Sequence, residues 1–192
     1  MIELLGKIIT NVLGGVYQSL WFALSQAILF MFAYKLIGDW KIAIKQWINW
    51  FRQDTQFRKV FFLAFVVVMM MFRTLYARTS WGSPLSNVIG VWGIYYSNGE
   101  LATETIENVL LFVPFTYVLF WTFHEKIFQK FSLIWITIHS IKSGFCTSVI
   151  IELLQLMLHV GTFQLSDIFF NTVGGILGGL CYFVYYRIKA KD

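Results

Sequence analysis

The sequence predicts an all-α polytopic membrane protein, a bundle of about five transmembrane helices plus one amphipathic interfacial helix. Of its 192 residues, 58% are hydrophobic and only 13% are charged, whereas soluble domains average about 45–50% apolar and about 25% charged residues. Apolar segments of roughly the 20 residues that a bilayer requires recur along the chain. The basic residues form no run dense enough to indicate nucleic-acid binding.

The N-terminal segment is ambiguous. Residues 1–17 carry apolar side chains at helical spacing, and Gly14 and Gly15 then interrupt the pattern. We expect a short interfacial helix that leads into a first span over residues 18–37. If residues 1–17 also cross the membrane, the bundle has six spans and both termini lie on the inner side.

Residues 39–59 differ from the segments around them. Trp40, Ile44, Trp47 and Phe51 repeat on one helical face, and basic and amide side chains occupy another. This pattern predicts an amphipathic helix in the headgroup region, where tryptophan sits at the apolar–polar boundary. A topological anchor is the favoured role, and recognition of an anionic lipid or a partner is the alternative. Residues 1–59 thus form an N-terminal unit that precedes the bundle of residues 60–187.

Four further spans are expected over residues 60–77, 108–123, 133–158 and 167–186. Pro114 predicts a bend in the second of these, because the carbonyl of Leu110 loses its helical donor. The connection 79–106 contains turn signals at Trp81, Gly82, Pro84, Gly90, Trp92, Gly93 and Gly99. Its apolar stretch VIGVWGIYY predicts a loop that packs on the end of the bundle or dips into it.

Lysine and arginine in the connections predict the orientation. One side of the membrane collects most of them: Lys35, Lys41, Lys45, Arg52, Arg58, Lys59, Lys126, Lys130, Arg187, Lys189 and Lys191. The opposite side holds Arg73 and Arg78. We therefore expect the N-terminus outside, the C-terminus in the cytoplasm and the 79–106 loop outside.

Polar residues interrupt the apolar segment 148–171. Ser148, Glu152, Gln155 and His159 are spaced four, three and four residues apart, so they share one helical face. An ionised carboxylate at this depth costs a few kcal/mol unless it is paired. We expect Glu152 to pair with Arg73 or Arg78, since Lys142 lies deeper and on another face.

The next span opens with Ser166 and Asp167, for which helix capping and the helix dipole are a sufficient explanation. Asn171, one turn later, can reach another helix. Eight polar side chains from four helices then project to one outer layer: Arg73, Arg78, Glu107, Asn108, Glu152, Gln155, Asp167 and Asn171. A ligand-binding site and a purely structural hydrogen-bond network account for this layer equally well.

Gly174, Gly175, Gly178 and Gly179 form two overlapping Gly-x-x-x-Gly pairs, which permit close helix approach. Packing inside the bundle is favoured over homodimerisation. Cys146 and Cys181 lie in apolar segments and are expected to be small buried hydrophobic residues. His124 and His139 are expected to be interfacial or hydrogen-bonded. The sequence has no zinc spacing, phosphate loop or serine elbow, so we expect no cofactor and no metal.

Five segments in series resemble the VanZ family of bacterial membrane proteins: RTLYART, SPLSNVIGVWGIY, ENVLLFVPF, SVIIELLQ and SDIFFNTVGGILGG. The resemblance covers about residues 70–185. It implies a small polytopic protein, and the founding member is associated with low-level resistance to the glycopeptide teicoplanin. The eight polar residues above stand where the family's polar positions fall. Gly161, Gln164 and Ser166 depart from the family's acidic form of the last motif, so no metal-binding or acid-rich catalytic role is carried over.

The leading hypothesis is therefore a non-enzymatic protein that binds an amphiphile, a lipoglycopeptide or a lipid-linked cell-wall intermediate, at its outer polar layer. The alternatives are an intramembrane enzyme with Glu152 or Asp167 as acid–base, and a small transporter. Membrane lipids are the expected surroundings in each case. The lack of a repeat, and of polar residues through the inner half apart from His139 and Lys142, counts against a transporter.

Overall fold

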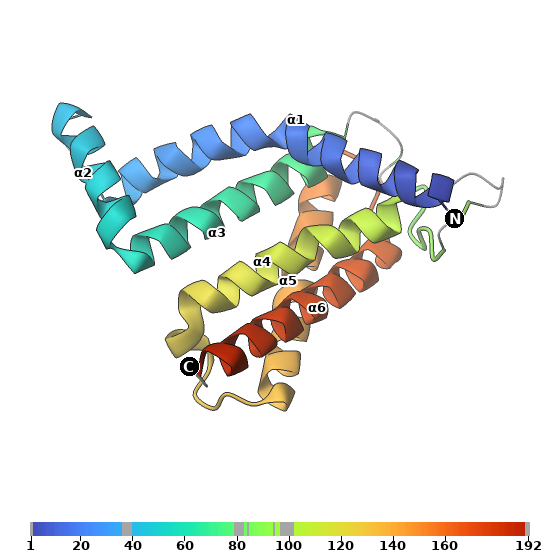
Figure 1. Cartoon of the computed structure of the whole chain (residues 1–192). Coiled ribbons are helices and arrows are strands. Elements are labelled where there is room, and N and C mark those ends of the chain that lie inside the picture. The colour runs from blue at the N-terminus through green and yellow to red at the C-terminus, as the bar shows by residue number, and fades with distance from the viewer. Residues whose placement is uncertain are drawn as a thin grey trace.

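The computed structural model describes residues 2–35, 40–78, 83, 85–93, 95–96 and 102–190, with the backbone alone at 2–4, 12, 34 and 40–43. Its helices (Figure 1) are α1 Ile2–Lys35, α2 Trp40–Gln53, α3 Thr55–Met71, the π-helical turn η1 Phe72–Tyr76, α4 Glu104–Ile127, α5 Leu133–Leu158 and α6 Leu165–Lys189. Within this part of the chain five helices are long and apolar enough to cross a membrane: Leu5–Ala33, Thr55–Tyr76, Glu104–Ile127, Leu133–Leu158 and Leu165–Lys189. This confirms the predicted fold class.

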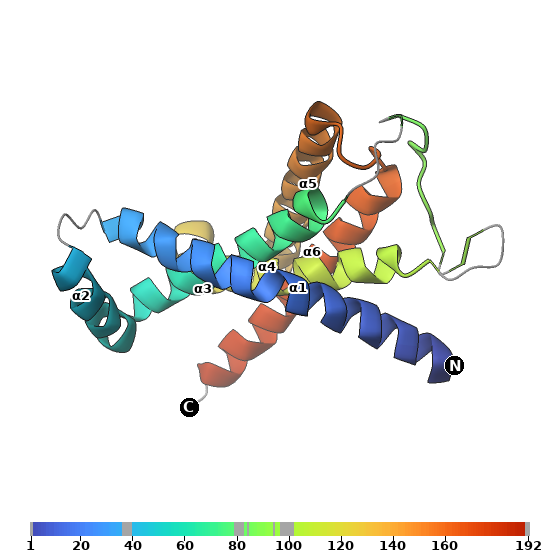
Figure 2. The same cartoon turned by 90° about the horizontal axis from the view of Figure 1, so that it is seen from above.

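The helices form two layers. Helix α6 packs extensively against both α4 and α5, and α1 packs against α3. The contact between α3 and α4 joins the two layers, and α5 crosses behind them (Figures 1 and 2). The N-terminus and the end of α6 lie at opposite ends of the bundle, as an odd number of spans requires. Which end faces the cytoplasm stays a prediction.

The glycines of α6 let it approach two helices at once. A Cβ atom at Gly174 would lie 2.3 Å from the carbonyl oxygen of Val109 on α4, and one at Gly178 would lie 2.3 Å from that of Val113. On the side of α5, a Cβ atom at Gly175 would lie 3.1 Å from the Cα of Gly144, and one at Gly179 would meet the hydroxyl of Ser140. The expected close packing within the chain is therefore confirmed. The expected burial of Cys146 and Cys181 is wrong, since both are exposed on the surface of the bundle.

Helix α1 corrects the prediction for the N-terminal segment. It runs unbroken from Ile2 to Lys35, so residues 1–17 form no separate interfacial helix, and the span count stays at five. Glycine in a helix costs only about 1 kcal/mol relative to alanine, which a 34-residue helix tolerates. Gly15 has a packing reason, because its bare Cα faces the guanidinium group of Arg73.

The predicted amphipathic segment 39–59 contains a helix boundary. Helix α2 ends at Gln53, and Asp54 caps α3 by accepting hydrogen bonds from the amides of Gln56 at 2.8 Å and Phe57 at 3.0 Å. Residues 55–59 therefore belong to the second span. Trp47 of α2 stacks on Phe51 and meets Phe57 edge-on. The apolar face of α2 is thus partly used for packing on the protein itself.

The bend that was expected at Pro114 of α4 is not seen in the backbone dihedral angles. They are helical at Pro114, and the non-helical angles lie at Phe123 (φ −117°, ψ 28°). In the 79–106 loop, the carbonyl of Val88 accepts the amide of Leu165 at 2.8 Å, and Trp92 contacts the rings of Phe169 and Phe170. The expected packing of this loop on the bundle end is confirmed for residues 88–92. The turn signals at 81, 82, 84 and 99 lie outside the described residues.

Candidate functional site: a polar cavity at one end of the bundle

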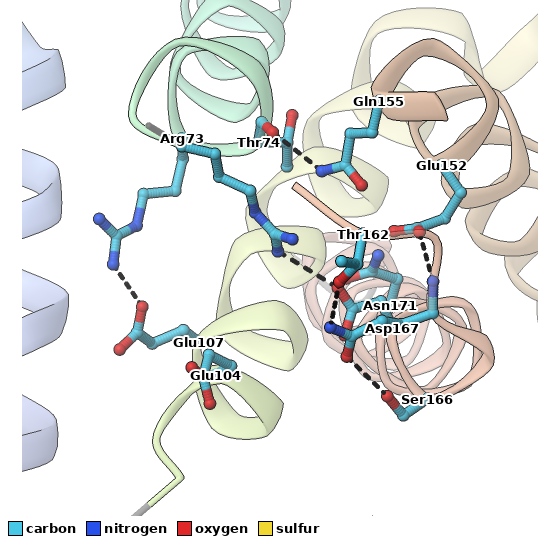
Figure 3. A network of polar contacts seen from close by, with 12 residues as sticks. Arg73, Thr74, Glu104, Glu107, Glu152, Gln155, Thr162, Ser166, Asp167 and Asn171 are labelled. Atoms are coloured by element: carbon cyan, nitrogen blue, oxygen red, sulfur yellow. Dashed lines mark hydrogen bonds and ion pairs between the residues drawn. The ribbon is translucent and has the colours of Figure 1, made fainter. Parts of the chain in front are cut away.

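A cavity of about 390 Å³ opens where η1, the start of α4 and the start of α6 meet. Five of the eight predicted site residues line it: Arg73, Arg78, Glu107, Asn108 and Asp167. The other three, Glu152, Gln155 and Asn171, lie outside its wall and are buried between helices. Figure 3 shows Glu152 on the side of the network remote from Arg73. The structure therefore divides the predicted layer into a cavity wall and a buried support.

The π-helical turn η1 sets the direction of the first arginine. Arg73 lies within it, and the turn closes with a hydrogen bond of 2.9 Å from the amide of Ala77 to the carbonyl of Phe72. Such turns widen the helix and occur often at functional sites. The carbonyl of Thr74 accepts a hydrogen bond of 2.9 Å from Nε2 of Gln155 on α5. Gln155 therefore fixes this turn against the neighbouring helix.

Arg73 forms an ion pair with Glu107 of α4 (Figure 3). The hydroxyl of Thr103 donates to Oε1 of Glu107 at 2.7 Å, and Nδ2 of Asn11 donates to Thr103 at 3.0 Å. A Cβ atom at Gly15 would lie 3.0 Å from Cζ of Arg73. Helix α1 thus covers this ion pair with a glycine and supports it with an amide.

Arg78 forms the second ion pair, with Asp167 of α6, at 3.2 Å between Nη2 and Oδ2. The Asp167 side chain is 7% exposed and that of Arg78 is 25% exposed. Gly161 packs against this arginine with a φ of 73°, and a Cβ atom there would lie 3.0 Å from Cδ of Arg78. Each arginine is therefore held between a carboxylate and a glycine from different parts of the chain.

Two residues of the cavity wall carry a buried polar atom to which the described residues offer no hydrogen bond of good geometry. They are Thr105 (Oγ1) and Asn108 (Nδ2), which are 5% and 8% exposed, and the Asn108 amide lies beside the carboxylate of Asp167. Nearby, the hydroxyl of Tyr96 donates to the carboxylate of Glu104. Buried polar groups are normally hydrogen-bonded. Both atoms are covered by protein in this structure, so a bound molecule reaches them after a shift of the cavity wall.

The expected pairing of Glu152 with an arginine is wrong. Its Oε2 accepts a hydrogen bond of 2.8 Å from the backbone amide of Gln164, and both arginines make their ion pairs with other carboxylates. Glu152 is 1% exposed, and this amide is the hydrogen-bond partner that the structure gives its carboxylate. Its position therefore ties the 159–164 turn to α5.

The turn itself explains two more differences. His159 is exposed and ends α5 with a left-handed backbone (φ 55°), so it leaves the buried face that Ser148, Glu152 and Gln155 share. Ser166 does not cap α6 either, because its hydroxyl accepts the amide of Val91 at 3.1 Å. Loop carbonyls at Val88 and Ile89 accept the first amides of α6 instead.

The expectations for Asn171 and His124 hold. Nδ2 of Asn171 donates to the hydroxyl of Ser148 on α5 at 2.8 Å, which confirms that it reaches another helix. The ring of His124 is hydrogen-bonded through Nδ1 to the hydroxyl of Tyr182 at 2.9 Å. In the part of the chain that the structure describes, no three His, Cys, Asp or Glu side chains gather as a metal site would require.

A prediction separates a structural from a chemical role for Glu152. Glu152→Gln keeps an oxygen for the amide of Gln164, so we expect the unfolding free energy to change by less than about 1 kcal/mol, whereas Glu152→Leu orphans that amide and costs roughly 1–3 kcal/mol. Thermal unfolding of the purified variants in detergent measures both. Equal losses in the two variants would show that the hydrogen bond is not what Glu152 provides.

Several residues of the cavity were not found from the sequence. The polar ones are Thr74, Asn87, Tyr96, Glu104, Thr105, Thr162 and Gln164. For two of them a signal was present, since Glu104 and Thr105 stand one turn before Asn108 on the same helix. Gly15 was interpreted as a helix interruption and Gly161 as a departure from the family motif, because the packing role of each depends on an arginine far away in the sequence.

A sequence model of the VanZ/LLP1 family matches residues 5–186. The match is longer than the resemblance carried by the motifs, since it includes α1 and α2, and α1 supplies Asn11 and Gly15 to the first ion pair. Searches of curated proteins and of solved structures find no match. The match spans nearly the whole chain, and the chain therefore belongs to the VanZ/LLP1 family.

Proposed function

We propose that this protein binds the polar head of an amphiphile in the cavity between η1, α4 and α6, and that this binding lowers susceptibility to teicoplanin. The ligand class is a lipoglycopeptide or a lipid-linked cell-wall intermediate. In the proposed orientation the cavity faces outward in a bacterial cytoplasmic membrane. The observation that carries the proposal is an open polar cavity whose wall combines two ion pairs with the side chains of Thr105 and Asn108.

The size of the cavity fits part of such a molecule. Small-molecule sites measure about 300–1,000 Å³, and this one has about 390 Å³. A single sugar ring or a short peptide portion suits that volume, while the rest of the amphiphile would lie along the lipid-facing surface. Exposed apolar side chains beside the cavity include Leu85, Ile89 and Trp92, at 61%, 69% and 52% exposure. They offer an acyl chain a surface next to the polar head.

The charges of the wall favour a ligand that forms hydrogen bonds over one that is only anionic. Two arginines and three carboxylates line the cavity: Arg73, Arg78, Glu104, Glu107 and Asp167. Both arginines already have carboxylate partners. A purely anionic head would have to displace one of these carboxylates. A head with hydroxyl, amide or amine groups can instead use Thr105, Asn108 and the outer carboxylate of Glu104.

The enzymatic alternative depends on a carboxylate at the cavity. Asp167 lines it, whereas Glu152 does not. Asp167 is therefore the acid–base candidate that the geometry leaves, and it is engaged by Arg78 at 3.2 Å. This engagement favours a positioning role over proton transfer, so we place binding ahead of catalysis.

The decisive experiment compares two threonines on one helix. Thr105 and Thr116 both have a buried, unpartnered hydroxyl on α4, but only Thr105 lines the cavity. We expect Thr105→Val to weaken binding of fluorescent teicoplanin by about fivefold to tenfold, the effect of one lost hydrogen bond. Asn108→Leu should act in the same direction. Thr116→Val should bind like the original protein.

The same variants are compared for protection. Cells that express Thr105→Val or Asn108→Leu should be more sensitive to teicoplanin than cells with the original protein, while the Thr116→Val strain stays protected. Thr105→Val and Thr116→Val should unfold at unchanged or higher temperature, because each replaces by a methyl group a hydroxyl that has no partner among the described residues. Normal binding by folded Thr105→Val and Asn108→Leu proteins would refute the proposal.

A further inference from the structure

A second cavity lies at the opposite end of the bundle, between α3 and the last turns of α4 and α6. Its volume is about 1150 Å³, roughly three times that of the polar cavity. The start of α3 and the ends of α4 and α6 lie on the same side of the bundle (Figure 1). In a membrane such an open groove must be filled by lipid or by water, and its walls determine which.

One wall is apolar and follows a membrane-spanning helix. Val60, Leu63, Ala64, Val67 and Val68 of α3 line the groove. From residue 59 to residue 68 the helix rises by about 13 Å, at 1.5 Å per residue. The hydrocarbon core is ~30 Å thick, so this length crosses most of one leaflet. Water would leave this wall unfavourably hydrated. An acyl chain lying along α3 would cover it.

The mouth of the groove is basic. Lys59 of α3, Lys126 of α4 and Lys189 of α6 line it, against one carboxylate, that of Glu125. No ion pair engages these three lysines in the described part of the chain. The ammonium groups of Lys59 and Lys126 lie 5.7 Å from the ring centres of Trp121 and Phe123. These aromatic contacts hold the two lysines at the end of the span.

We propose that this groove binds one anionic phospholipid, with its phosphate among Lys59, Lys126 and Lys189 and an acyl chain along α3. The three lysines come from three different helices, so the phosphate would tie together ends that the protein itself leaves apart. A zwitterionic lipid fits the apolar wall equally well but gains less from three unpaired cations. The excess of positive charge therefore selects the anionic headgroup.

The experiment measures lipid selectivity in vesicles. The full-length protein is reconstituted in phosphatidylcholine vesicles that carry trace spin-labelled phosphatidylglycerol or spin-labelled phosphatidylcholine. The motion-restricted fraction of each probe gives its relative affinity for the protein. We expect phosphatidylglycerol to be favoured by about fivefold, the ratio that corresponds to about 1 kcal/mol. The triple variant Lys59→Gln, Lys126→Gln, Lys189→Gln should lose this preference.

A matched control removes the same charge outside the groove. Lys45, Lys130 and Arg187 are exposed and do not line it. Their triple exchange to glutamine should keep most of the preference. In a second variant, Leu63→Trp with Val68→Trp fills the groove from α3 without changing any charge and should lower retention of phosphatidylglycerol. Equal retention of the two probes by the original protein would show that it does not select the anionic headgroup. Equal loss of the preference in the two triple variants would show only general surface attraction. Either result would overturn the proposal.

Discussion

Gly178→Ala is expected to separate α4 from α6 and to destabilise the protein by about 2–3 kcal/mol, the upper part of the range for overpacked cores. The new methyl group would meet the carbonyl oxygen of Val113 at 2.3 Å. A flexible side chain could turn away from it, but a helix backbone cannot. The gain in helix propensity from glycine to alanine, about 0.5–1 kcal/mol, is too small to offset this contact.

Gly174→Ala meets the carbonyl of Val109 at the same 2.3 Å. Both methyl groups press on α4 from one face of α6, so a displacement that relieves one also relieves the other. We therefore expect the double variant to lose less stability than the sum of the two single losses. Denaturation in sodium dodecyl sulfate, followed by tryptophan fluorescence, measures all three variants.

Gly14→Ala is the control for the change from glycine to alanine. A methyl group at Gly14 would have nothing within 4 Å, although this residue too lies within a membrane-spanning helix. We expect this variant to be neutral or stabilised by up to about 1 kcal/mol. A loss at Gly14 as large as that at Gly178 would mean that the close approach of α4 and α6 is not the cause.

The sequence allowed the helices to be located more accurately than their ends. The span 133–158 agrees with α5, because Ser132 accepts the amide of Trp135 and a basic connection precedes it. The segment 39–59 resembles one helix in sequence, since the periodicity continues across Asp54 and only the cap reveals the boundary. Gly14 and Gly15 were predicted to interrupt the first helix, because glycine is common where helices end. A glycine that is needed for packing looks like one that ends a helix.

The polar residues of the site were identifiable, but their partners were not. Counting residues along each predicted span gives the depth of each polar side chain in the bilayer. This count predicted that the arginines and carboxylates lie at one end of the bundle. Pairing depends on which helices are neighbours: Arg73 meets Glu107 because α3 packs on α4. Charge balance predicts an arginine beside Glu152, whereas a backbone amide of the 159–164 turn supplies its hydrogen bond. The sequence carries no pattern that reports such a turn.

The second large effect is expected at the ion pair of Arg78 and Asp167. Arg78→Met should cost about 3–5 kcal/mol, because it leaves a buried carboxylate without its cation. The Asp167 side chain is 7% exposed and that of Arg78 is 25% exposed. Asp167→Leu should therefore cost less, since the guanidinium left behind can turn toward water. Thermal unfolding in detergent ranks the two variants.

The double variant Arg78→Met with Asp167→Leu tests what the pair contributes. It leaves no charge unpaired, so most of the stability lost in Arg78→Met should return. Lys35→Met is the surface comparison: Lys35 is paired with Asp54 at 3.9 Å with both side chains about a third exposed, and pairs of that kind are worth less than about 1 kcal/mol. A double variant as unstable as Arg78→Met would mean that the fold itself requires the charges. A stable double variant that no longer binds teicoplanin would instead mean that the ion pair is maintained for the ligand, at a position where apolar packing serves the fold as well.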